Sequence, residues 1–295
     1  MIINLRYHIV SLVAVFLALG IGILIGSAVL GNDTIAQSQQ QVADRLEKHL
    51  NELRHENEVV RQQLAALQAE NAVQRQFSKD ALPFLVAGRL AGVNVALVET
   101  SPFATGQDLR PVLEMAGARV VSVTSIINGF AVEERKPELL AAAGWPDMGE
   151  KQLIRRLAEA TGQAIMKGRT PLIDYLEQED MLTITGEYGK PVNYVIVVGG
   201  GHDGDRTLLT QLDIPLLDVF AKNKISVCGV EETSVPFSYM KDYQRRCTAT
   251  VDNIDTVAGQ FALVAAIAGQ PGNYGVKETA ESLLPGFATE EDASR

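Results

Sequence analysis

The sequence is poor in the side chains that most enzymes and metal sites use. Its 295 residues include only two cysteines and four histidines, and three of those histidines lie within the first 55 residues. Soft metal ions need thiolates or thioethers in clusters, but the methionines are scattered and neither a CxxC pair nor a histidine-rich tract occurs. A Ser-His-Asp hydrolase would have to use His202, and no GxSxG motif is present. We therefore expect a protein that is not an enzyme.

Charge is missing from residues 9–30, a run of 22 residues that are apolar except for a serine near each end. As a helix this run would be about 33 Å long, which matches the roughly 30 Å hydrocarbon core of a bilayer. A retained membrane anchor is the favoured interpretation. A cleaved signal peptide, with residues 26–28 as its small-residue site, and a buried core helix are the alternatives. Arg6 before the run and Asp33 after it predict a single-pass protein of the cell membrane with a cytoplasmic N-terminus.

Proline and glycine are absent from residues 32–78, where core-type residues recur at spacings of three and four. This pattern predicts a coiled coil that holds one register for five heptads. The a positions are Ala43, Leu50, Asn57, Leu64 and Asn71, and the d positions are Leu46, Leu53, Val60 and Leu67.

The asparagines at a positions favour a parallel homodimer, because buried asparagine pairs with itself across two strands and fixes their register. Glu56 at a g position would face Arg61 of the partner helix, and Glu70 would face Arg75. The alternative is a single amphipathic helix that folds back on its own domain.

Small residues recur every four positions in the apolar run, at Ala14, Ala18, Gly22 and Gly26. Such a stripe lets a second membrane helix approach closely. A parallel coil that begins at the membrane would bring two such helices side by side. We therefore expect the dimer interface to comprise Ala14, Ala18, Gly22, Gly26, Leu46, Leu50, Leu53, Asn57, Val60, Leu64, Leu67 and Asn71.

The net charge of the chain is −10, most of it carried after the heptads. Such an acidic domain has no electrostatic attraction for nucleic acid, and we expect no nucleic-acid partner. The sequence predicts five parts: a cytoplasmic start and transmembrane anchor (1–31), the coiled coil (32–80), a linker (81–91), an extracytoplasmic α/β domain (92–287) and an acidic tail (288–295). Pro83 is expected to end the long helix a few residues on.

The domain alternates strand-like and helix-like segments. Strands are expected at 92–99, 118–123, 193–198 and 225–230, with helices at 108–117, 208–211, 216–222 and 255–269 and a mainly helical insertion over 133–182. A βαβ opening argues for a parallel sheet. We expect a doubly wound, three-layer α/β domain.

A glycine loop, Gly199-Gly200-Gly201, follows the most apolar strand and precedes His202 and Asp203. Open α/β sheets bind ligands at the carboxyl ends of their strands, so these five residues are the candidate ligand loop. The histidine and the nearby aspartates could hold a divalent metal. The alternative is a turn that needs positive φ, with Asp205 capping the next helix, and Asp252 to Asp255 has the same character of a turn and cap.

The two cysteines, Cys228 and Cys247, lie in apolar, strand-like stretches. A disulfide is possible outside the cell, but free cysteine also serves as a small buried hydrophobe, and both interpretations stay open. With His202 they are the weak candidates for metal ligands. A single span without an ionisable residue cannot by itself line an ion path.

Both ends of the chain resemble the MctB-type copper transport proteins of bacteria. The stretches are NLRYHIVSLVAVFLALGIGILIGS (4–27) and VDNIDTVAGQFALVAAIAGQPGNYGVKETAESLLP (251–285). The family has the same order of anchor, coiled coil and α/β domain. The resemblance implies a role in copper transport or homeostasis, with copper as the one metal it suggests.

SteB-like corynebacterial relatives imply a different role, in septum formation with a membrane partner. Two hypotheses follow, a copper-linked protein and a structural scaffold that docks another envelope protein.

Overall fold

The structure is a computed structural model that describes residues 5–29, 32–101, 106–133, 135–201, 204 and 206–286. The chain divides into two compact units, Met1–Gln74 and Arg75–Arg295. The acidic tail expected at 288–295 lies outside the described residues.

The first unit contains the apolar helix α1 (Leu5–Val29) and most of the long helix α2 (Asn32–Val86). The stretch Arg6–Ala28 is long and apolar enough to cross a membrane, and none of it is buried within the protein. A Cβ atom added at Gly22 or Gly26 would meet nothing within 4 Å. The small-residue face of α1 is therefore open within one chain.

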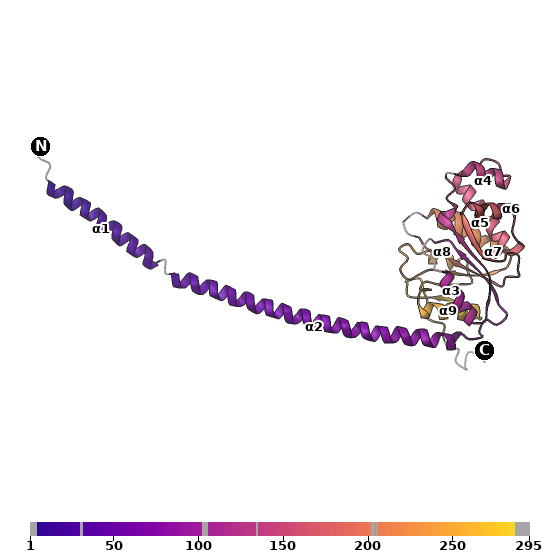
Figure 1. Ribbon diagram of the computed structural model, residues 1–295, viewed down its shortest axis with the longest axis horizontal. Helices are drawn as coiled ribbons and strands as arrows, with labels where there is room; N and C mark the ends of the chain where they lie inside the picture. The colour runs from indigo at the N-terminus through magenta and orange to yellow at the C-terminus, as the bar shows by residue number, and fades with distance from the viewer. Residues whose placement is uncertain are drawn as a thin grey trace. The chain divides into compact units, whose positions relative to one another are not determined.

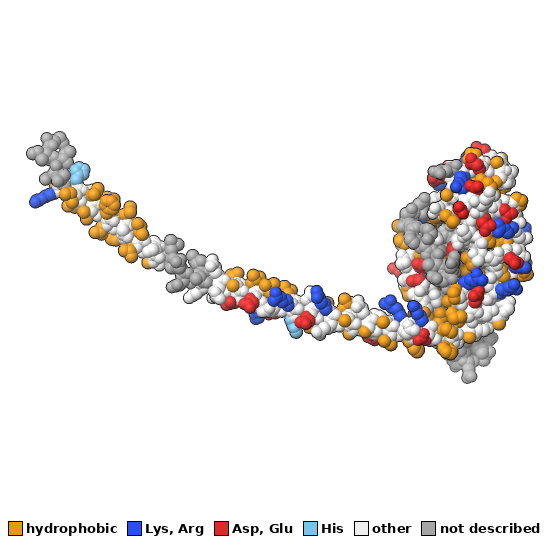
Figure 2. Space-filling view, in the orientation of Figure 1, with side chains coloured by type: hydrophobic (Ala, Val, Ile, Leu, Met, Phe, Trp, Pro, Cys, Tyr) orange, Lys and Arg blue, Asp and Glu red, His pale blue; other side chains and the backbone are white. Residues whose placement is uncertain are grey.

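Helix α2 continues without a break through every expected heptad position. Its apolar side chains form patches along the helix in Figure 2. Pro83 lies inside α2, three residues before its end at Val86, as the sequence predicts. Leu82, Val86 and Leu90 are buried in the core of the second unit, so the segment expected as a linker (81–91) contributes to the folded domain.

The second unit is built on a seven-stranded sheet with the order β3-β2-β1-β4-β5-β6-β7. All neighbouring strands are parallel except β2 and β3, which pair antiparallel. The strands are β1 (Asn94–Glu99), β2 (Arg119–Ile126), β3 (Leu182–Gly186), β4 (Tyr194–Val198), β5 (Ser226–Val230), β6 (Ala249–Val251) and β7 (Asn273–Tyr274).

Helices cover both faces of the sheet, and each face has its own hydrophobic core. One face carries α3 (Gly106–Met115) and α9 (Val257–Ile267), which contact each other (Figure 1). The other face carries α4 (Lys136–Ala143), α5 (Glu150–Lys167), α6 (Pro171–Gln178), a π-helical turn (Leu209–Asp213), α7 (Ile214–Lys222) and the short α8 (Met240–Tyr243).

Four of the strands were expected from the sequence, and the structure confirms them within a few residues. These strands are buried on both faces, so their sequences are nearly continuous apolar runs. The insertion expected over 133–182 is helical, and its helices lead into β3, which the sequence pattern did not reveal. The short strand β6 lies in the strand-like stretch that contains Cys247, whereas β7 was not expected.

Candidate functional site

The carboxyl ends of β1 and β4 meet in the middle of the sheet. Thr100 and Ser101, which follow β1, both donate backbone hydrogen bonds to the carbonyl of Val198, at 3.0 and 3.4 Å. From this pair of strands the chain builds the sheet outward in both directions. Ligands of open α/β sheets bind at such a reversal of strand order, and the glycine loop 199–201 follows β4 there.

The protein's own side chains occupy the space beside the three glycines. A Cβ atom at Gly199 would lie 1.9 Å from the hydroxyl of Tyr243, and one at Gly200 would lie 2.7 Å from Val235. A Cβ atom at Gly201 would lie 2.8 Å from the hydroxyl of Tyr239. The glycines are therefore required by packing, which supports the interpretation as a turn.

A segment from 231 to 240 closes over this loop. Gly201 and Phe237 exchange backbone hydrogen bonds of 2.9 and 3.2 Å. Gly200 has a φ of +110°, a conformation that favours glycine. His202 and Asp203, the other members of the candidate loop, and the neighbouring Asp205 lie outside the described residues.

A buried carboxyl group lies behind the glycine loop. Asp213 ends the π-helical turn, is fully buried, and accepts a hydrogen bond of 2.6 Å from the hydroxyl of Tyr243. Burial raises the pKa of Asp213 from 3.8 to about 7, against the opposing effect of the hydroxyls of Tyr243 and Thr100. Its Oδ1 atom has no hydrogen-bond partner within the described part of the chain. Short π-helical turns often occur at functional positions.

A second buried carboxylate follows β5. Glu231 is fully buried, and its Oε1 atom accepts hydrogen bonds from Lys277, at 2.7 Å, and from the hydroxyl of Ser238. Its Oε2 atom accepts one from the backbone N–H of Tyr239 at 3.0 Å. The ion pair is therefore enclosed, and hydrogen bonds from Ser238 and Tyr239 satisfy the remaining acceptor positions of the Glu231 carboxylate.

The segment that supplies Lys277 is held by Asp252 at the end of β6. The two carboxylate oxygens of Asp252 accept hydrogen bonds from the backbone N–H groups of Val276, at 2.7 Å, and Lys277, at 3.0 Å. A Cβ atom at Gly275, whose φ is +144°, would lie 1.9 Å from Asp252 Oδ1. Asp252 therefore fixes the C-terminal segment against the sheet.

The two cysteines lie on opposite faces of the sheet. Cys228 belongs to the core beneath α3 and α9, whereas Cys247 packs against the core on the other face. Both cysteines are free. Burial raises the pKa of the Cys228 thiol to about 12, and it also raises the pKa of the Cys247 thiol. They do not converge on a shared metal site, and no cluster of three His, Cys, Asp or Glu side chains occurs among the residues described.

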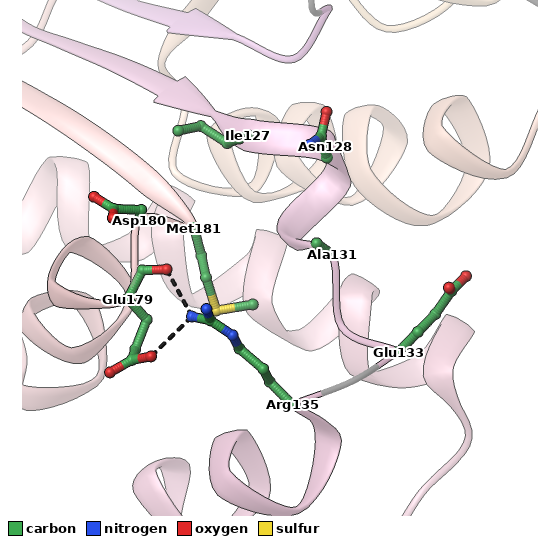
Figure 3. A pocket seen from close by; sticks show the side chains of 8 residues that line it. All are labelled: Ile127, Asn128, Ala131, Glu133, Arg135, Glu179, Asp180 and Met181. Carbon is green, nitrogen blue, oxygen red and sulfur yellow. Dashed lines mark hydrogen bonds and ion pairs between the residues drawn. The ribbon is translucent and has the colours of Figure 1, made fainter.

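A cavity of about 400 Å³ opens where β2 ends and the antiparallel β3 begins. In Figure 3 the guanidinium of Arg135 reaches Glu179, to whose carbonyl and carboxylate it donates hydrogen bonds of 2.7 and 2.8 Å. Asn128, Ala131 and Asp180 have φ values of 47°, 43° and 54°, uncommon for residues other than glycine. The lining residues are Ile127, Asn128, Ala131, Glu133, Arg135, Glu179, Asp180 and Met181. The sequence pattern did not indicate this recess.

The residues expected at the dimer interface are exposed within a single chain. The six large apolar side chains at heptad positions are between 45% and 61% exposed: Leu46, Leu50, Leu53, Val60, Leu64 and Leu67. Asn57 and Asn71 are exposed in the same helix, as are Ala14, Ala18 and Gly22 in α1, whereas Gly26 is half-buried. An exposed apolar stripe of this length is typical of an interaction surface.

Sequence reasoning missed Asp213, Tyr243 and the Glu231–Lys277 pair. One signal was available, because Asp213 is an isolated acidic residue between two apolar segments, LLTQL and IPLL. An ionisable residue in such a position is buried with its neighbours and acquires a shifted pKa. No comparable signal existed for Glu231 and Lys277, which are 46 positions apart.

Comparison with known proteins assigns the chain to a family. A family model described as "Copper transport outer membrane protein, MctB" matches residues 2–285. No curated protein matches the chain. A single apolar N-terminal helix fits a single-pass member of a membrane-associated family. Because the match covers almost the whole sequence, the chain belongs to the MctB family of copper transport proteins.

Proposed function

We propose that this protein acts in copper homeostasis as a membrane-anchored, parallel homodimer of the cell envelope. The family match over residues 2–285 is the observation that supports the link to copper. The N-terminus would be cytoplasmic, because Arg6 precedes the uncharged run 9–30 and Asp33 follows it. The α/β domain, which we interpret as doubly wound and three-layered, would then be displayed outside the cytoplasm.

The homodimer is supported by the exposed heptad face of α2. Burying such a face between two helices would stabilise the dimer by about 25 cal/mol for each Å² of apolar surface removed from water. Asn57 and Asn71 would set the register. In this proposal the protein is not an enzyme, and copper is its cargo or its signal.

Copper passage through one such anchor alone is not part of the proposal. The segment Arg6–Ala28 carries no ionisable side chain beyond Arg6, Tyr7 and His8 at its start, and ion paths through a membrane are lined by polar or ionisable groups. The dimer would act with another envelope or membrane protein. The second candidate function is a structural scaffold that binds this partner in a septal complex. The long exposed apolar face of α2 favours it.

Copper content and copper tolerance of a deletion strain test the first proposal. We expect a higher copper content and a lower tolerance, both restored by the wild-type gene. Complementation with Leu53→Glu plus Leu64→Glu should fail, because two charges per chain would enter the heptad seam. The matched control places the same charges at f positions, on the side of the helix away from the seam, with Gln62→Glu plus Ala69→Glu, and should restore tolerance.

Unchanged copper content and tolerance in the deletion strain would contradict the copper role. Enrichment of a tagged copy at the septum, with co-purification of a membrane protein, would then support the scaffold. Cysteine crosslinks at Leu53 and at Leu64 test the dimer itself in native membranes. Failure of both crosslinks between like subunits would remove the parallel coil from either proposal.

A further inference from the structure

The last turns of α2 have two apolar faces. Leu82 and Val86 are buried in the core of the domain, at 5% and 0% exposure. On the same turns Phe84 is 87% exposed, and two turns earlier Phe77 is 73% exposed. At about 100° per residue, Phe84, two positions from both Leu82 and Val86, projects from nearly the opposite side of the helix. The domain therefore covers one face and leaves the other open.

An exposed face with two phenylalanines is unusual for a surface helix. A helix that is apolar on all sides is normally buried on all sides, and phenylalanine is among the most buried residue types. Leu85, beside Phe84, is also 45% exposed. Phe77, Phe84 and Leu85, here called the outer face of α2, therefore require a partner that covers them.

The heptad register indicates which partner this is. Continued past Asn71, the register places Ser78 and Leu85 at a positions and Ala81 at a d position. Phe77 and Phe84 both fall at g positions, on the flank of the same seam. At Ser78 and Ala81 the a and d side chains are small, and the large apolar side chains of this stretch are Phe77 and Phe84 at g and Leu85 at a. The side that would face the second helix therefore remains apolar.

Charge supports the same partner. Glu70 and Arg75 are the last g and e positions before the phenylalanines, and they are complementary between two parallel copies in register. No proline or glycine lies between Asn71 and Phe77, and Pro83 lies within the outer face of α2, where the helix continues to Val86.

We propose that the outer face of α2 binds the same face of a second copy of this chain, so that the dimer interface extends from the coiled coil into the α/β domain. This inference rests on the proposed parallel homodimer. It adds Phe77, Phe84 and Leu85 to that interface and brings the two domains together at the ends of their α2 helices.

Cysteine crosslinking of the full chain in native membranes tests this extension, in a Cys228→Ser plus Cys247→Ser background. Leu85→Cys should crosslink two copies as efficiently as Leu53→Cys, because both are a positions of one seam. Lys79→Cys, an exposed b position, is the matched control and should not crosslink. A Leu53→Cys crosslink without a Leu85→Cys crosslink would overturn the inference and leave the dimer intact. Failure of both would remove the dimer as well.

A second measurement uses charge on the outer face. Phe77→Asp plus Phe84→Asp should raise the dimer dissociation constant of the detergent-solubilised chain on the order of 100-fold, since four phenylalanines would lose their cover. Val73→Asp, on an exposed c position, should change it little. The thermal unfolding of the domain should not change, because both phenylalanines are exposed in one chain. An unchanged dissociation constant, or loss of a different envelope protein instead of the second copy, would contradict the inference.

Discussion

Replacing Asp213 with asparagine should remove a pH-dependent loss of stability from the domain. Asp213 is fully buried, and its pKa is raised from 3.8 to about 7 mainly by that burial. The unfolded chain releases this proton near pH 4, whereas the folded domain holds it until about pH 7. Between these values the folded state binds more protons than the unfolded state, so its stability falls as the pH rises.

The magnitude follows from the size of the shift. Each unit of pKa difference corresponds to about 1.4 kcal/mol, so a shift of about three units costs the folded state about 4 kcal/mol once the pH exceeds 7. Relative to this high-pH state, the protonated form of Asp213 makes the folded domain more stable. That contribution is fully present below pH 4 and is lost as the pH rises through the folded pKa. Asparagine carries no titrating proton, so the Asp213→Asn variant should lack this slope.

Urea unfolding of the full chain in nanodiscs measures the effect. Trp145, the only tryptophan of the sequence, packs against the domain core and reports its unfolding by fluorescence. From pH 5 to pH 7 the Asp213→Asn variant should gain about 2.3 kcal/mol in unfolding free energy relative to wild type, because the folded group is still half protonated at pH 7. Comparing pH values within each protein cancels any constant effect of the substitution.

Two further variants make the result decisive. Asp218→Asn changes a half-exposed carboxylate on α7, the helix that follows Asp213, which pairs with Arg246 beyond the end of α8. This variant should keep the wild-type slope. Tyr243→Phe removes a hydroxyl that lowers the pKa of Asp213, so the loss of stability should extend above pH 7. Parallel pH profiles for wild type and Asp213→Asn would refute the reasoning.

Three other predictions concern the same edge of the sheet. Gly199→Ala should destabilise the domain by about 2 kcal/mol or more, since its Cβ atom would meet the hydroxyl of Tyr243, and Tyr243→Phe should restore part of the loss in the double variant. Lys277→Met should cost about 3–5 kcal/mol in urea unfolding, because Glu231 would stay buried without its partner; adding Glu231→Gln should recover part. Cys228 should react slowly with iodoacetamide until urea unfolds the domain, and rapid labelling of the native protein would contradict its burial.

The sequence predicted those elements whose burial shows in their own residues. The strands β1, β4 and β5 are apolar over almost their whole length. The strand β3 reads LTITG, and β7 consists of two residues. Their pairing depends on neighbouring strands from distant parts of the chain, and such context overrides local preference.

The candidate site shows the same limit. The glycine loop 199–201 could be located from its sequence, but the three side chains that fill it come from residues 34–44 positions later. The pattern of glycine after a buried strand is the same whether a ligand or a tyrosine occupies the space. Only the packing of Tyr243 against Gly199 distinguishes the two.

Asp252 and Glu231 are joined to residues 276–277 by hydrogen bonds and an ion pair, which affects the order in which the domain is completed during synthesis. While the ribosome is still adding residues beyond β6, Glu231 lacks its cationic neighbour and Asp252 lacks two amide donors. The nascent domain thus holds Glu231 without its counter-charge and Asp252 without these two amide donors until residue 277 is available to fold.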